Sequence, residues 1–201
     1  MFDQIAAAND RLRSLLDPPL AVGEPSGLPG WTRGHLLTHF ANCARAIARQ
    51  AEYALRGETI EIYDGGRPGR AAAIEAGAHR PAREQAEDVR AALDELEAVW
   101  CKATTADWAR PVSYRDGTLL GTAQAWWREI ELHTVDLGLG YTPAEWTPEF
   151  TAYLTDFLRV RLPGPVELSG DPTDVAAWLA GRPHAGPVTA EGGLPELLPY
   201  P

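Results

Sequence analysis

The chain has 201 residues, of which 45% are hydrophobic and two are cysteines. Its 18 Lys and Arg against 28 Asp and Glu give a formal net charge of −10, which argues against binding to nucleic acid or to anionic membranes. No apolar run reaches the roughly 18 residues that a membrane helix needs, and the N-terminus lacks a signal-peptide pattern. Two cysteines cannot build a disulfide framework, so we expect a soluble, cytoplasmic protein of one domain, with or without an appendage.

The first two predicted elements are helices separated by a Gly/Pro-rich connector. Apolar residues at helical spacing predict a helix over residues 2–16, ended by Asp17-Pro18-Pro19. After the connector at 22–30, Thr32 is predicted to cap a long helix that ends near Gly57. This second helix has the most regular apolar period in the chain.

The middle of the chain is less regular. Residues 58–80 contain four glycines, which predicts an irregular crossover with a short helical turn around 71–76. Pro81 is expected at the first position of a third helix that runs to about Trp100, with a solvated acidic face. Turn signals in residues 107–121 indicate a short hairpin.

The last third predicts two more full helices and a small mixed region. Thr122 is expected to cap a fourth helix that runs to about Leu139 and is ended by Gly140, and a fifth helix covers 148–161. A short strand at 166–168 and a short helix at 171–179 follow, and the rest is a Pro/Gly-rich tail.

These elements predict an all-α fold. We expect an antiparallel bundle of about four long helices over residues 1–162, followed by a small α/β appendage at 163–201. Helix bundles of this kind build metal or cofactor sites from side chains that point inward.

Two helices carry side chains with the spacing of metal ligands. On the fourth helix, Glu129 and His133 are four residues apart, so both can grip one cation. The alternative is a hydrogen-bonded Glu–His pair on a wet surface. On the second helix, His35 and His39 are also four residues apart, and Cys43 extends the same row. A site with one i, i+4 pair still needs a third ligand from elsewhere in the chain.

Two long motifs carry a resemblance to a known family. Residues 28–41 (LPGWTRGHLLTHFA) and 128–138 (REIELHTVDLG) resemble the two signatures of the mycothiol-dependent maleylpyruvate isomerases. These enzymes are members of the DinB-like metal-binding four-helix bundles. Residues 57–77, including Tyr63 and Arg70, resemble the family's crossover, and 178–182 (WLAGR) resemble its closing element.

The resemblance implies a catalytic metal site. It implies that His39, Glu129 and His133 hold the metal, usually zinc, and that His35 is a helix residue near the site. Two imidazoles and one carboxylate leave Zn²⁺ with about one net positive charge and open positions for water or a thiol. The resemblance further implies mycothiol as co-substrate, whose thiolate adds to maleylpyruvate and leaves again to give fumarylpyruvate.

Four other residues are candidates near the site. Asp136 lies on the ligand face one turn beyond His133, where it could accept an imidazole N–H, or it is a solvent-exposed helix residue. Arg182 resembles a family arginine that serves activity, and its alternative is an interaction with a helix C-terminus. Trp31 and Trp126 could wall a thiol-binding pocket, or they belong to the core.

Two departures from the family pattern leave the reaction open. Cys43 stands where the family usually has Asn, and Arg45 where it usually has Asp. Cys43 is read as an extra ligand, a reactive thiol in the pocket, or a small buried residue. The substitutions favour, as a second hypothesis, a thiol S-transferase. A non-catalytic metal- or ligand-binding bundle is the third hypothesis.

The region after Pro163 is shorter than the family's appended domain. We expect a monomer or a small homo-oligomer.

Overall fold

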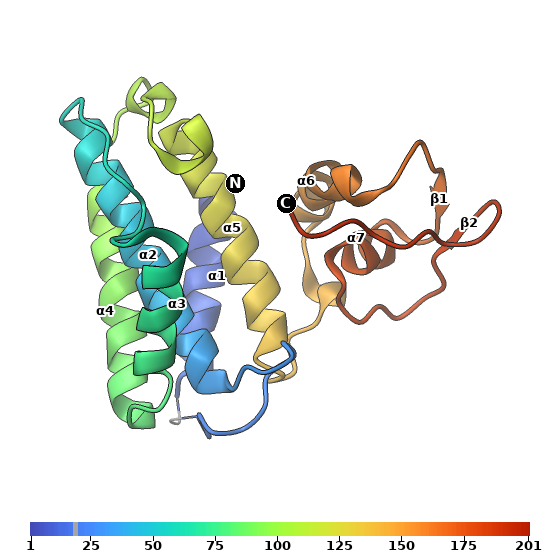
Figure 1. Ribbon diagram of the computed structural model, residues 1–201, viewed down its shortest axis with the longest axis horizontal. Coiled ribbons are helices and arrows are strands. Elements are labelled where there is room, and N and C mark those ends of the chain that lie inside the picture. Colours follow the sequence, from blue (N-terminus) through green and yellow to red (C-terminus); the bar gives the residue numbers. More distant parts are fainter. Residues whose placement is uncertain (18–19) are drawn as a thin grey trace. The chain divides into compact units, whose positions relative to one another are not determined.

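The computed structural model describes residues 1–17 and 20–201 (Figure 1). They form two compact units, Phe2–Gly138 and Leu139–Pro201. This division falls earlier than the predicted boundary after residue 162. The helix expected at 148–161 packs against the short helix that follows it, so it belongs to the second unit. The first helix was predicted to end at Asp17-Pro18-Pro19, and the two prolines of this segment lie outside the described residues.

The first unit is a four-helix bundle with one extra helix. Its long helices are α1 (Phe2–Leu15), α2 (Arg33–Leu55), α4 (Ala82–Trp100) and α5 (Leu119–Asp136). Helix α2 packs against α4 and α5, and α1 packs against the same two from the other side. The extra helix, α3 (Gly66–Gly77), lies along α2 (Figure 1).

Helix α3 sets the direction of the helices around it. It returns the chain along α2 before α4 begins, so α2 and α4 run in the same direction (Figure 1). Contacts follow this direction, since Gly34 at the start of α2 lies beside Gln85 of α4 and Arg45, further along α2, pairs with Glu95, further along α4. The expected purely antiparallel bundle is therefore wrong for this pair. Helices α2 and α5, which carry the candidate ligands, run antiparallel.

The bundle core is mainly apolar and includes a buried polar link between α1, α4 and α5. Trp126 Nε1 of α5 donates to Asn9 Oδ1 of α1 at 3.0 Å, and Asn9 Nδ2 donates to Glu97 Oε1 of α4 at 2.7 Å. This link satisfies polar groups that would be costly to bury alone. The largest fully buried side chains of the bundle are apolar or aromatic: Ile5, Leu12, Leu16, Leu36, Leu37, Phe40, Ile47, Leu93, Leu96, Leu119 and Trp126.

The helical part of the predicted crossover is longer than expected: it is a three-turn helix over 66–77 and not a short turn around 71–76, whereas residues 58–65 are non-helical as predicted. Gly65 enters α3 in the left-handed conformation at φ +71°, and the following run of alanines favours a helix. Gly77 is needed for close packing, because a Cβ there would lie 2.5 Å from Thr38 Cγ2. The glycines that argued against a helix therefore serve its start and its contact with α2.

Two helix starts and one expected hairpin differ from the sequence prediction. Pro81 is the N-cap of α4 and not its first helical residue. Thr118, and not Thr122, caps α5 by accepting a hydrogen bond from Gly121 N. Thr122 is buried one turn later, where its hydroxyl donates to Leu119 O. Among the described residues of 107–121 there is no strand pair, only an isolated antiparallel bridge between Pro111 and Thr118.

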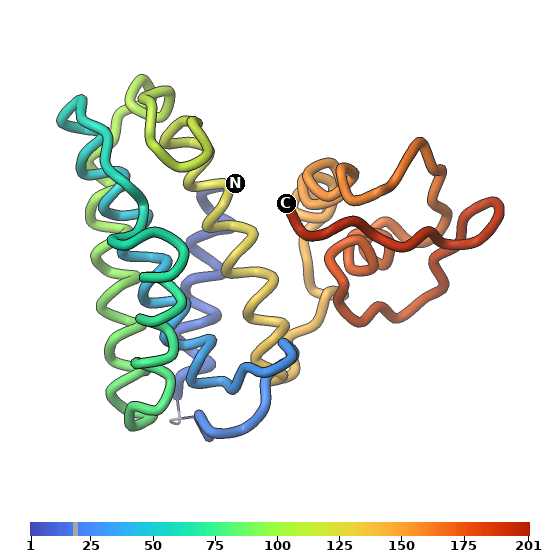
Figure 2. Tube along the Cα trace, in the orientation of Figure 1, coloured from blue at the N-terminus to red at the C-terminus, as the bar shows by residue number. Residues whose placement is uncertain are grey.

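The second unit is small and mixed, and its trace is shown in Figure 2. It contains α6 (Pro148–Leu158), α7 (Pro172–Ala180) and the short antiparallel strands β1 (Leu168–Ser169) and β2 (Thr189–Ala190). The last three residues of the predicted fifth helix form a 3-10 turn, Arg159–Arg161. The expected α/β character of the C-terminal region is confirmed. Among the described residues, no helix is long and apolar enough to cross a membrane.

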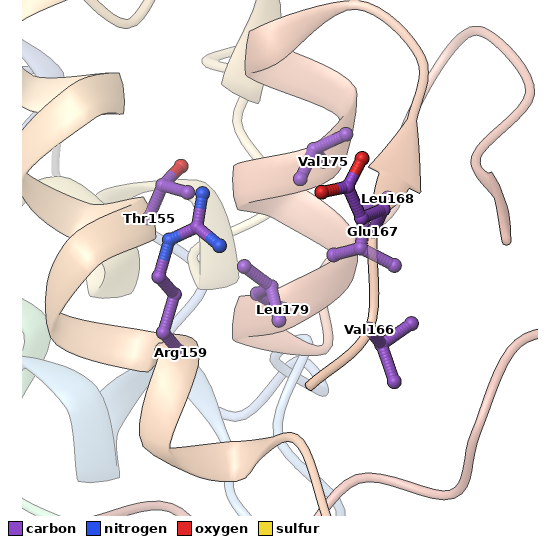
Figure 3. Close-up of a pocket in the computed structure, with 7 residues that line it drawn as sticks. All are labelled: Thr155, Arg159, Val166, Glu167, Leu168, Val175 and Leu179. Atoms are coloured by element: carbon purple, nitrogen blue, oxygen red, sulfur yellow. The ribbon is translucent and has the colours of Figure 1, made fainter. Parts of the chain in front are cut away.

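The second unit also holds a cavity of about 270 Å³ between α6, α7 and β1 (Figure 3). Thr155 of α6 and Arg159, just after this helix, line one side, and Glu167 lines the other. The rest of the lining is aliphatic.

Candidate metal site

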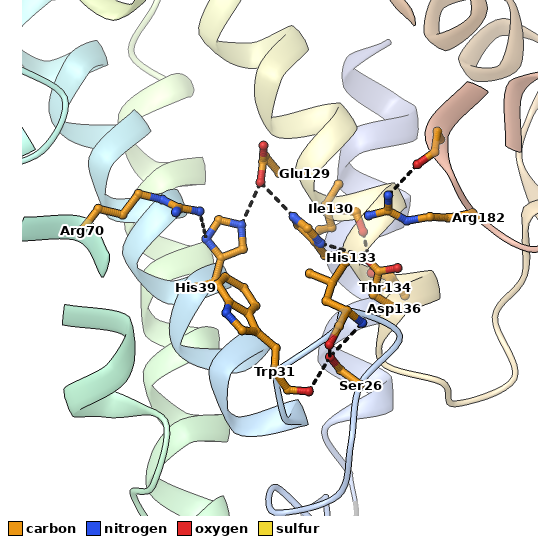
Figure 4. A network of polar contacts seen from close by, with 12 residues as sticks. Ser26, Trp31, His39, Arg70, Glu129, Ile130, His133, Thr134, Asp136 and Arg182 are labelled. Atoms are coloured by element: carbon orange, nitrogen blue, oxygen red, sulfur yellow. Dashed lines mark hydrogen bonds and ion pairs between the residues drawn. The ribbon is translucent and has the colours of Figure 1, made fainter. Parts of the chain in front are cut away.

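Three candidate ligands meet between α2 and α5 (Figure 4). Glu129 Oε2 lies 2.8 Å from His39 Nε2 and 3.2 Å from His133 Nε2. The three side chains each offer one ligand atom, and these atoms lie within 4.8 Å of one another. The spacing on α5 places Glu129 and His133 side by side, and the antiparallel packing of α2 brings His39 opposite them.

These donors fit a divalent cation. For metal–ligand bonds of about 2.1 Å, tetrahedral geometry separates neighbouring ligand atoms by about 3.4 Å. The observed 2.8 and 3.2 Å lie a few tenths of an ångström below this value, so small side-chain shifts would admit an ion. Two nitrogens and one carboxylate oxygen suit zinc and several other transition metals.

The site is buried on one side and open on the other. The His39 side chain is 2% exposed, whereas His133 is 16% and Glu129 is 30% exposed. A ligand can therefore reach the Glu129 side of the group from solvent. A closed structural metal site would cover all of its ligands.

Asp136 supports His133 from behind. Its Oδ2 lies 2.8 Å from His133 Nδ1, and the carboxylate is buried. Burial opposes the charged form of His133, but the hydrogen bonds to Asp136 and Glu129 outweigh it and raise the pKa of the imidazole above its ordinary value. A carboxylate on the outer nitrogen orients a histidine and makes it a stronger metal ligand.

His39 and Glu129 are shifted the other way. Burial lowers the pKa of His39, although the Glu129 carboxylate opposes this effect. Burial by itself would raise the pKa of Glu129, but hydrogen bonds from His133 and His39 hold it well below its usual range. The site therefore contains a carboxylate that stays ionised and a histidine that favours the neutral form, as metal binding requires.

Trp31 lies next to a candidate ligand, whereas Trp126 lies in the core. The connector before α2 is pinned to the end of α5, since Gly27 N donates to Asp136 O at 2.7 Å. This places the Trp31 ring 5.7 Å from the His39 ring, centroid to centroid. Trp126 is fully buried and is separated from the ligands by Phe40, so its position fits the core alternative and not a contact with a thiol.

Cys43 lies one turn beyond His39 on α2 but is not among the residues that converge on the site. Its thiol is buried and shares a hydrogen bond with Tyr63. Burial, with the nearby Glu129 charge, raises the pKa of the thiol. These observations fit a small buried residue better than an extra ligand or a reactive thiol.

Arg182 belongs to the second unit and follows the C-terminal end of α7. Gly181 takes the left-handed conformation at φ +69° that ends many helices, and the Arg182 guanidinium donates to Ala180 O at 2.6 Å. This contact matches the alternative of an interaction with the helix C-terminus. A role of Arg182 in activity stays a prediction.

A second group of possible ligands consists of His35, Glu75 and His79. His35 completes a capping box, because its Nδ1 accepts the Thr32 backbone N–H at 3.1 Å. The proton of the neutral ring therefore sits on Nε2, which faces Glu75 at 3.3 Å. A fixed backbone donor holds this tautomer, so His35 would have to give up the helix cap to bind a cation through Nε2.

Two further residues lie at the site, and the sequence motifs that contain them predicted no role for either. Arg70 of α3 lies with its Nη2 3.1 Å from His39 Nδ1, and Tyr63 hydrogen-bonds with Arg70 and with Cys43. Both come from the segment predicted to be irregular, so no helical spacing related them to His39. Only their place in the family-like crossover marked them.

Two similar solved structures are the mycothiol-dependent maleylpyruvate isomerase and a histidine-to-alanine variant of it. Their TM-scores are 0.84 and 0.83, and both are 23% identical to this chain. Each alignment covers 99% of this chain and 92% of the other chain, so nearly all of both chains is aligned. At this identity the likeness shows the fold, and it confirms the all-α, DinB-like bundle with a small C-terminal appendage.

A comparison of the sequence with curated proteins found no match. Residues 2–138, which are the bundle unit, match the family described as the mycothiol maleylpyruvate isomerase N-terminal domain. This range includes His39, Glu129 and His133 together with the crossover that carries Arg70. The chain therefore belongs to the mycothiol maleylpyruvate isomerase N-terminal domain family.

Proposed function

We propose that this protein is a metal-dependent enzyme that activates a low-molecular-weight thiol for addition to an electrophilic double bond. The preferred reaction is the mycothiol-dependent isomerisation of maleylpyruvate to fumarylpyruvate. The family supports the reaction class. The observation that carries the proposal is the half-open group of His39, Glu129 and His133.

The proposed metal is zinc, held by His39 Nε2, Glu129 Oε2 and His133 Nε2. A divalent cation there lowers the pKa of a thiol that reaches it, so the thiolate is available at neutral pH. Glu129 supplies the negative charge that partly neutralises the cation, and Asp136 holds His133 in the orientation in which Nε2 faces the site. The buried His39 side keeps one face of the site dry.

The proposed reaction neither consumes the thiol nor changes the oxidation state of the substrate. The thiolate forms a C–S bond to one carbon of the cis double bond, and the π electrons move onto the conjugated carbonyl. The remaining C–C single bond rotates, the electrons return, and the C–S bond breaks. The products are the trans isomer and the original thiolate, so catalysis needs no oxidant or reductant.

Metal analysis with product analysis tests this proposal. We expect about one zinc per chain in the purified protein, and turnover of maleylpyruvate to fumarylpyruvate with mycothiol recovered unchanged. His39→Ala is expected to lose both the metal and the turnover. His184→Ala is the matched control, because His184 is exposed in the second unit and its ring hydrogen-bonds to Gly186 O, two residues further along the chain.

The other outcomes are informative. Equal zinc content in His39→Ala and the control would refute the ligand assignment. A stable thioether product with the thiol consumed would replace the isomerase proposal by a thiol S-transferase. Metal binding without turnover of thiol and electrophile would leave a non-catalytic binding bundle, which the exposed Glu129 side of the site argues against.

A further inference from the structure

Arg70 connects the candidate metal site to a neighbouring cavity. Its Nη2 donates to His39 Nδ1 over 3.1 Å (Figure 4), and its guanidinium carbon lies 5.8 Å from the centroid of the Tyr63 ring. The same side chain lines a cavity of about 250 Å³ between α2 and the crossover. A ligand in this cavity would therefore lie next to the ring of a proposed metal ligand.

The cavity carries a positive charge that no carboxylate neutralises. Three arginines line it, and two of them form ion pairs. Arg45 contacts Asp88 at 2.7 Å, and Arg49 contacts Asp64 at 2.7 Å. Arg70 has no ion pair with any carboxylate in the described part of the chain, and its partners are His39 and Tyr63.

A half-buried cation without an anion is costly, and a bound anion would remove this cost. The guanidinium presents five N–H donors in a planar fork that matches a carboxylate. One of them contacts His39 here, which leaves donors for a ligand in the cavity. The volume of about 250 Å³ suits a small organic acid and not a nucleotide or a peptide.

The contact between Arg70 and His39 also depends on the state of the ring. Arginine only donates, so His39 Nδ1 must accept, and the proton of the neutral ring sits on Nε2. A histidine that binds a cation through Nε2 carries its proton on Nδ1 and cannot accept from Arg70. Arg70 is a long side chain that can turn away, unlike the backbone donor that holds His35. Occupation of the site by a metal would therefore free Arg70 for another acceptor.

We propose that Arg70 binds a carboxylate group of the substrate in this cavity, beside the metal site. This inference rests on the proposed function and assigns to Arg70 the recognition of a carboxylate group of its substrate. It also makes metal binding and anion binding favour each other. A metal ion on His39 Nε2 ends the contact between Arg70 and His39 and frees Arg70 for the anion, and an anion bound to Arg70 replaces that contact.

Calorimetric titration with maleate, a small cis-dicarboxylate, tests the proposal on the zinc-loaded protein. We expect Arg70→Gln to weaken maleate binding at least tenfold, while zinc content stays at about one per chain. Arg70→Lys keeps the charge and should lose less than Arg70→Gln. Arg67→Gln is the matched control, because Arg67 lies on the same helix, is exposed and does not line the cavity. Neutral maleamide should not bind measurably to the wild-type protein.

A second readout separates ligand binding from a general loss of structure. Removal of a cation near the ligands should leave zinc affinity in Arg70→Gln equal to or higher than in the wild type, whereas damage to the site would lower it. Maleate affinity in Arg70→Gln within twofold of the wild type would overturn the proposal. So would no measurable maleate binding to the wild-type protein.

The two proposals fail in distinguishable ways. If maleate binding depends on Arg70 but maleylpyruvate is not turned over with mycothiol, the anion site stands and the proposed reaction is wrong. If turnover occurs and Arg70→Gln binds maleate normally, the reaction stands and the assignment of Arg70 is wrong.

Discussion

Asp136 offers the sharpest test of the site, because its carboxylate contacts the outer nitrogen of His133 and is not itself a proposed ligand. Its Oδ2 lies 2.8 Å from His133 Nδ1, and its side chain is 3% exposed. Replacement by asparagine keeps the size of the side chain and a neutral acceptor, but it removes the negative charge. The ring of His133 then loses both basicity and part of its orientation.

The expected loss follows from the type of contact. Removing the hydrogen-bond partner behind a ligating histidine typically weakens metal binding by about 10- to 100-fold. Because each tenfold corresponds to about 1.4 kcal/mol, this is a loss of about 1.4 to 2.8 kcal/mol in binding free energy. The contact is short, charged and buried, so we expect Asp136→Asn to fall in the upper half of this range.

The assay is competition for zinc with a chromophoric chelator at pH 7.5. Glu52→Gln is the matched control, since Glu52 is an exposed carboxylate on α2 and none of the cavities described above includes it. Thermal unfolding of both metal-free variants checks that each is folded. A zinc affinity of Asp136→Asn within twofold of the control would refute the role of Asp136 in supporting His133.

Three further predictions concern pH, packing and thiol reactivity. Zinc must displace the proton of His133, whose pKa is raised above 6.5. The zinc affinity should therefore rise about tenfold per pH unit through and above pH 6.5 before it levels off. Equal zinc affinity at pH 6 and pH 7 would contradict this prediction. Gly34→Ala would place a Cβ 2.1 Å from Ala78 O, so it should destabilise by about 1 to 3 kcal/mol in denaturant unfolding. Gly121→Ala, whose Cβ would meet nothing nearer than 3.8 Å, should instead stabilise by up to about 1 kcal/mol, and equal effects of the two changes would refute this packing argument. A thiol reagent should label one of the two cysteines in the folded protein and both after unfolding, because Cys43 is buried and its thiol pKa is raised; two fast thiols in the folded state would contradict its placement.

Local pattern was enough to predict the elements that bury an apolar face. The second helix was expected from Thr32 to near Gly57, and α2 runs over Arg33–Leu55 with Thr32 as its N-cap. An apolar period of 3.6 residues is a property of neighbours in sequence, so it can be recognised without the fold. The start of α5 was missed by one turn, because Thr118 and Thr122 are both suitable caps and only packing buries the second.

The crossover shows where local pattern fails. Its glycines predicted irregular chain, yet Gly77 is there to let α3 approach Thr38 closely. A glycine required by a neighbouring helix cannot be distinguished from one that breaks a helix until the neighbour is in place. Arg70 and Tyr63 could not be assigned for the same reason, since their partners His39 and Cys43 are far away in sequence.

The sequence by itself determined the helical class, the i, i+4 pair of Glu129 and His133, and, through two motifs, the family. Spacing alone left His35 and His39 equivalent, because both lie on the same row of one helix. Only the tertiary structure decided between their surroundings: it turned His39 toward Glu129 and tied His35 into a helix cap. It also placed Trp126 in the core and Arg70 beside the site, since contacts between helices depend on packing directions that no local pattern contains.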